Sequence, residues 1–86
     1  MPRIIPEDLE KRLRLITEEQ KLSVSILVQN GYELSTLTDY FKQNNIPHQE
    51  VPDLGMVATS LQKGQIYHLA SKPYVVLILY DEPLKA

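Results

Sequence analysis

The chain has 86 residues, of which 43% are hydrophobic, and 9 basic against 11 acidic side chains give it a formal net charge of −2. This size supports one domain with a single core, and the hydrophobic content argues against disorder. The lack of cysteine excludes disulfides and thiolate metal sites, and the charge balance offers no basic surface for nucleic acid.

The first residues contain no long apolar segment and no small-residue cleavage site, so no secretory signal peptide is expected. No apolar run reaches membrane-spanning length either. We therefore expect a cytoplasmic protein with no membrane or nucleic-acid partner. Its expected organisation is an N-terminal helix and linker over residues 1–20, one domain over residues 21–82 and a C-terminal tail over residues 83–86.

An amphipathic helix is predicted from Pro6 to about Thr17. Pro6 suits the first position of a helix, where a missing N–H costs no hydrogen bond. One apolar stripe follows at helical spacing, formed by Leu9, Leu13 and Ile16. Oppositely charged side chains four residues apart add a small stabilisation along this helix.

A strand is predicted next, over residues 22–28, where large apolar residues alternate with other residues. The smaller and more polar face of this strand carries Ser23, Ser25 and Leu27. The Asn30-Gly31 pair after it has the residue types of a turn.

A second helix is predicted from Leu34, because Leu34, Leu37 and Phe41 recur at helical spacing. Ser35 or Thr36 is expected to cap its first turn. An asparagine-rich stretch ends it.

A hairpin is predicted after this helix. Its short first strand is His48–Val51, and its second strand is Met56–Leu61. The turn between them is Pro52–Gly55, with Gly55 available for a positive φ.

The last predicted elements are a helix over Lys63–Ser71 and a strand over Tyr74–Tyr80, separated by the helix-breaking Pro73. The helix places Ile66, Leu69 and Ala70 on one side. The strand is apolar on both faces, which is typical of a strand that is covered on both sides.

After the leading helix, the order βαββαβ is that of the ferredoxin-like α+β sandwich. In that fold two helices cover one face of a four-stranded antiparallel sheet with the strand order 4-1-3-2, and the last strand lies at an edge. Alternation groups the last strand into Val76, Ile78 and Tyr80 on one face and Val75, Leu77 and Leu79 on the other. Nothing within βαββαβ covers the second face, so the N-terminal helix, a second copy of the chain or a different protein is expected to bury it.

Several features between Leu54 and Asp81 form a pattern at continuous spacing. These features are the strand end Ala58-Thr59-Ser60-Leu61, the helical pair Ile66 and Leu69, then Pro73, then a strand with Val75 at its start, then acidic Asp81 and Glu82. In this pattern the chain resembles the C-terminal half of the subtilisin propeptide and peptidase inhibitor I9 family. Residues 23–29, the second helix and the hairpin resemble the first half of that family more weakly.

The resemblance implies the ferredoxin-like fold and an inhibitor or folding chaperone of a subtilisin-like serine protease, acting in trans. Members of the family pack the open sheet face on two surface helices of the protease and lay their C-terminal tail in its substrate cleft. Asp81 and Glu82 would then cap the N-termini of those helices. The implied partner-binding residues are Ser25, Leu27, Thr59, Val76, Ile78, Tyr80, Asp81, Glu82 and Leu84.

No enzyme is predicted. Ser60 and Ser71 lack a plausible base and an orienting group, and three scattered glycines give no phosphate-binding loop. The two imidazoles are His48 and His68, and His48 with Glu50 would supply at most two metal ligands. We therefore expect no catalytic residue, no cofactor and no metal.

Two functions and a third arrangement follow from these patterns. The first function is the propeptide-like inhibitor or chaperone described above. The second is a non-inhibitory module for protein interaction or homo-oligomerisation that uses the same open face, because a fold does not fix a function. In the third arrangement the N-terminal helix covers the open face and the protein is a closed monomer.

Overall fold

The computed structural model describes residues 4–29 and 34–81 of the chain. Within these residues the chain forms three α-helices, four strands and one short 3-10 helix. Their bounds are α1 Glu7–Leu15, β1 Lys21–Val28, α2 Leu34–Gln43, β2 His48–Val51, η1 Pro52–Leu54, β3 Met56–Gln62, α3 Lys63–Ala70 and β4 Val75–Tyr80. Every predicted helix and strand is present, with ends that differ only slightly from those expected from the sequence.

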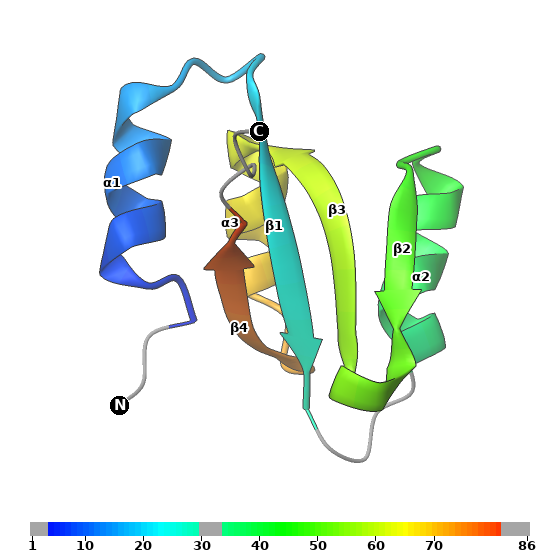
Figure 1. Cartoon of the computed structure of the whole chain (residues 1–86). Helices are drawn as coiled ribbons and strands as arrows, with labels where there is room; N and C mark the ends of the chain where they lie inside the picture. Colours follow the sequence, from blue (N-terminus) through cyan, green and yellow to red (C-terminus); the bar gives the residue numbers. More distant parts are fainter. Residues whose placement is uncertain (1–3, 30–33, 82–86) are drawn as a thin grey trace, which may run out of the picture.

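The four strands of the described residues form one antiparallel sheet in the order β2-β3-β1-β4 (Figure 1). Read from the other edge this is 4-1-3-2, so the ferredoxin-like α+β fold with an added N-terminal helix is confirmed. β1 lies between β3 and β4 and pairs with both, so the stretch from Met56 to Tyr80 is a split βαβ unit with α3 as its crossover.

The core lies between the sheet and the helices that cover one of its faces. Alternate residues of β1, among them Val24 and Ile26, point into this layer and are 0% exposed. Phe41 of α2 and Leu69 of α3 meet them from the helix side and are also fully buried. The other buried apolar residues of this cluster are Leu9, Leu13, Val28, Leu37, Val57, Leu61, Ile66, Val75 and Ile78.

The N-terminal helix α1 belongs to this same core. Its Leu9 and Leu13 are 0% exposed and join the cluster that contains Ile78 of β4. Just before α1, the carbonyl oxygen of Ile4 accepts a hydrogen bond of 2.8 Å from the Ile78 N–H. Figure 1 shows α1 standing beside β4 rather than across the sheet. α1 therefore closes the outer edge of β4, and the arrangement in which it covers the open face is wrong.

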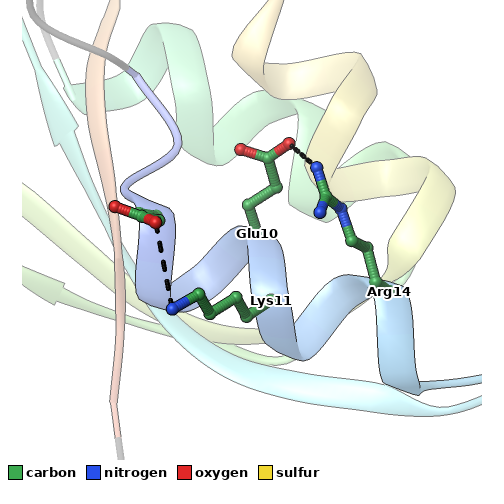
Figure 2. Close-up of polar contacts among 4 residues, drawn as sticks. Glu10, Lys11 and Arg14 are labelled. Carbon is green, nitrogen blue, oxygen red and sulfur yellow. Dashed lines mark hydrogen bonds and ion pairs between the residues drawn. The ribbon is translucent and has the colours of Figure 1, made fainter.

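The solvent side of α1 carries ion pairs at four-residue spacing. Arg14 Nη2 lies 2.9 Å from Glu10 Oε1, and Lys11 Nζ lies 3.8 Å from Glu7 Oε1 (Figure 2). Exposed pairs of this kind stabilise a helix by about 0.2–0.5 kcal/mol each. The burial of the apolar stripe, rather than these pairs, therefore holds α1 in place.

No helix among the described residues is both long and apolar enough to cross a membrane.

The structure confirms the turn that was predicted at Gly55 but not the N-cap that was predicted for α2. Gly55 has a φ of +64° and its N–H donates to the Pro52 carbonyl oxygen at 3.0 Å, as the turn prediction requires. Ser35 and Thr36 do not precede α2 but lie inside it, so they cannot be its N-cap. A capping box does occur at α3, where the Gln62 N–H donates to Gln65 Oε1 at 2.9 Å.

Two glycine-to-alanine substitutions are expected to change stability in opposite directions. Gly55→Ala should lower the free energy of unfolding by about 1–2 kcal/mol, because a side chain disfavours the left-handed region. Gly64→Ala should raise it by roughly 0.5–1 kcal/mol, because Gly64 lies inside α3 and a Cβ there meets nothing within 4 Å. Urea unfolding of both variants measures the two changes, and shifts of the same sign would contradict the backbone account.

Candidate docking surface

The face of the sheet opposite the helices, here called the open face, is built of rows of side chains that cross the strands: an apolar, a middle and a polar row and, beyond the last of them, the pair Lys21 and Gln62. The strand register defines these rows. The apolar row is Val51, Met56, Leu27 and Leu77. The middle row is Gln49, Ala58, Ser25 and Leu79. The polar row is Ser60, Ser23 and Asp81, with the Asp81 N–H donating to the Ser23 carbonyl oxygen at 2.9 Å.

β4 carries exposed hydrophobic side chains on the open face and beside it. Leu79 is 38% exposed and Val76 is 41% exposed, although both belong to a strand in the sheet. Leu27 and Leu77 are paired beside them and half-buried. Exposed apolar surface of this kind on a flat sheet is typical of a site that contacts another protein.

An irregularity in the pairing of β1 with β4 decides which β4 residues point outward. Leu27 pairs with Leu77, but the next residue, Val28, pairs with Val75, so Val76 is bulged out of register. Val75 is consequently 3% exposed and faces the core. The predicted grouping of Val76 on the same face as Ile78 is therefore wrong, because simple alternation does not hold through a bulge.

The polar end of the open face is a shallow hollow. Asp81 lies at its rim, and one carboxylate oxygen accepts a hydrogen bond of 2.6 Å from Ser25 Oγ. The hydroxyl oxygens of Ser23 and Ser60 are 3.4 Å apart on its floor. Lys21 is also at this end. The residues that line the hollow therefore include hydroxyl side chains, one carboxylate and one amine, together with His48 and Gln49.

The structure places the sequence-predicted partner-binding residues in different environments. Ser25, Leu27 and Asp81 lie on the open face or at its rim, and Val76 is exposed next to it. Ile78 is 0% exposed on the helix side, so a partner on the open face cannot contact it. Glu82 and Leu84 lie outside the described residues.

Thr59 and Tyr80 also fall on the helix side. Thr59 pairs with Val24, is 8% exposed, and donates its hydroxyl to the Pro47 carbonyl oxygen at 2.7 Å. Tyr80 also pairs with Val24, and the Arg12 guanidinium lies 5.4 Å from the centre of its ring. The sheet register therefore puts the side chains of these two residues, with that of Ile78, on the helix side, although Thr59 also lines the hollow. Leu77 and Leu79 occupy the outward positions of β4 that Ile78 and Tyr80 were expected to fill.

The histidines take part in packing between elements. His48 Nδ1 donates to the Ile46 carbonyl oxygen at 2.9 Å, and its ring centre lies 5.2 Å from that of Phe41. The His68 ring lies 5.6 Å from Tyr40 across α2 and α3. No group of three or more His, Cys, Asp or Glu side chains that could hold a metal ion occurs in the part of the chain that the structure describes.

Tyr74 is a titratable group whose environment changes its acidity. Burial raises the pKa of the Tyr74 phenol, and the nearby Tyr40 raises it further. Because the folded-state pKa exceeds the unfolded value, this contribution to stability is full below about pH 10 and is lost as the pH rises through the folded pKa. Tyr74→Phe should therefore make the alkaline fall in stability shallower. Urea midpoints measured between neutral and strongly alkaline pH test this, and an identical alkaline slope in both proteins would contradict it.

The open face carries groups that can contact another molecule. Its apolar row can bury surface against a partner, while the hydroxyls, the Asp81 carboxylate and the Lys21 amine can bond polar groups at the other end. Comparisons with known protein families, with curated proteins and with solved structures give no match to this chain.

Proposed function

We propose that this protein is a protein-binding module that docks through its open face onto a subtilisin-like serine protease, and that it acts in trans as an inhibitor or folding chaperone of that protease. The observation that supports docking is the open face itself, where Leu79 is 38% exposed and α1 lies to one side. The choice of protease rests on the sequence resemblance between Leu54 and Asp81.

The three rows suit a partner that presents helices. Small side chains in the middle of the face, Ser25 and Ala58, let a helix approach the sheet closely. Leu77 and Leu79 then supply apolar contact along β4. In this proposal the face meets the partner with its apolar row at one end and its polar row at the other, which fixes the orientation of the docked helices.

Asp81 has a defined role in this proposal. Its carboxylate follows β4 directly, and the hydrogen bond from Ser25 Oγ holds it at the end of the open face. A carboxylate in that position is favoured by the free N–H groups and the positive end of a helix N-terminus, typically by about 0.3–1 kcal/mol at an exposed site. Asp81 would therefore orient the partner more than it strengthens binding.

The test is a titration of a purified subtilisin-like protease with the intact chain. The expected result is saturable inhibition of peptide hydrolysis at nanomolar to micromolar concentration, together with a one-to-one complex in gel filtration. A chaperone action would appear as faster recovery of activity when the denatured mature protease is refolded with the chain present. The proposal is refuted if the chain gives no inhibition, no assisted refolding and no complex at ~100 μM. A dissociation constant of that size corresponds to a binding free energy of about −5.5 kcal/mol.

A further inference from the structure

The open face is complementary to itself. Within each row, the side chain on β1 is complementary to the side chain on β4, so two copies related by a two-fold axis can pack row against row. The three adjacent pairs are Leu27 with Leu77, Ser25 with Leu79, and Ser23 with Asp81. A two-fold axis parallel to the strands, running between β1 and β4, lays β4 of each copy on β1 of the other and brings every row against the same row.

The side chains of the first two rows fit when two copies face each other in this way. Leu27 meets Leu77 of the second copy, which buries these two residues of the apolar row against each other. Leu79 meets Ser25 of the second copy, so a large side chain faces a small one. Two sheets packed face to face lie about 10 Å apart with strands nearly aligned, which is the spacing that such interdigitating side chains fill.

The charges at the polar end fit the same axis. Asp81 faces Ser23 of the second copy, and Lys21 of that copy lies one row further along β1, within the reach of a long side chain. Lys21 makes no ion pair within residues 4–29 and 34–81 of its own chain. Two symmetric Lys21–Asp81 pairs would therefore form across such an interface.

The other in-plane axis is disfavoured. A two-fold axis across the strands reverses their direction and lays the apolar row of one copy on the polar row of the other. Leu77 would then cover the Asp81 carboxylate, which costs free energy unless the charge keeps a partner, and Leu27 would cover Ser23. The distribution of polar and apolar side chains thus selects one geometry.

We infer that the protein forms a symmetric homodimer through its open face, with the two-fold axis parallel to the strands and Lys21 of each copy paired with Asp81 of the other. The dimer hides the surface that a protease would occupy, so self-association limits the amount of binding-competent monomer. This competition rests on the proposed function, whereas the dimer itself rests only on the open face.

Sedimentation equilibrium of the intact chain, over concentrations from micromolar to about millimolar, tests the dimer. The expected particle at high concentration has twice the 9.9 kDa mass of one chain. Lys21→Asp and Asp81→Lys should each weaken dimerisation by about tenfold or more, since like charges then face each other. The double variant restores opposite charges and should regain most of the affinity. Lys42→Asp, on the exposed side of α2, is the matched control and should dimerise like the unmodified chain.

Three outcomes would overturn the inference: a monomer at every concentration, a dimer insensitive to both single reversals, or a double variant no better than the weaker single one. Lys21→Gln and Asp81→Asn, which remove charge without reversing it, repeat the test should a reversal variant fail to fold. Protease inhibition is assayed separately with dilute monomer. A chain that dimerises but, as dilute monomer, gives no inhibition, no assisted refolding and no complex refutes the proposed function alone. An inhibitory monomer that never dimerises refutes this inference alone.

Discussion

Leu13→Ala is expected to lower the free energy of unfolding by about 2–5 kcal/mol. Leu13 is 0% exposed and packs in the cluster that α1 shares with β4 and α3. Removing its side chain takes away the transfer free energy of the buried atoms and leaves a cavity that the neighbours only partly fill. Small domains are typically stable by about 5–15 kcal/mol, so one such change is a large fraction of the total.

Leu15→Ala provides the matched control on the same helix. Leu15 is 81% exposed, so its truncation should change the free energy of unfolding by no more than about 0.5 kcal/mol. Denaturant unfolding, followed by circular dichroism, measures both variants. Equal and small effects at Leu13 and Leu15 would contradict the conclusion that α1 is part of the core.

Leu79→Asp is expected to weaken binding of the partner protease by at least about 100-fold, which corresponds to roughly 2.7 kcal/mol. Docking would bury Leu79 in the middle row of the open face, and an aspartate there leaves a carboxylate desolvated without a matching charge. The same change should alter the folded monomer little, since Leu79 is 38% exposed before any partner binds.

The inhibition assay and the unfolding assay together isolate this effect. Leu15→Asp carries the same chemical change to an exposed leucine on α1, away from the open face, and should inhibit like the unmodified chain. Undiminished inhibition by Leu79→Asp would remove the open face from the proposed mechanism. A loss of inhibition that is fully explained by a smaller amount of folded protein would also count against a role for the open face.

Periodicity predicted the elements and their order because α1, α2, β1 and β3 each bury a regular stripe. Leu9 and Leu13 predicted an amphipathic helix, and Val24 and Ile26 predicted the buried face of β1. From β1 alone, the alternation also indicates that Ser25 and Leu27 point the other way, as the structure places them.

Two features lay beyond the reach of the sequence pattern. The apolar stripe predicts that α1 buries one face, but it does not predict which element α1 packs against. Only contacts in the structure, such as the Ile4–Ile78 hydrogen bond, show that α1 lies at the edge of β4. The bulge at Val76 puts Val75 in the core and leaves Val76 exposed. The sequence does not distinguish these two positions, because both carry the same side chain. The outward-facing residues of β4 could therefore be identified only from the pairing of β4 with β1.

The propeptide resemblance stays a prediction, and the fold alone does not decide it, because one fold supports many functions. What the structure adds is a specific surface on which the prediction can be tested. Lys21 and Asp81 lie at one end of that surface and Leu27 and Leu77 at the other, so the surface has a polar end and an apolar end.

The most direct test of docking through the open face is methyl NMR of the isotope-labelled chain during titration with an unlabelled subtilisin-like protease. Intermolecular contacts are predicted at the methyl groups of Leu27, Leu77 and Leu79, whereas Leu37 and Leu69, buried on the helix side, should show none. Contacts confined to α1, α2 or α3, with the three open-face leucines unaffected, would contradict the account.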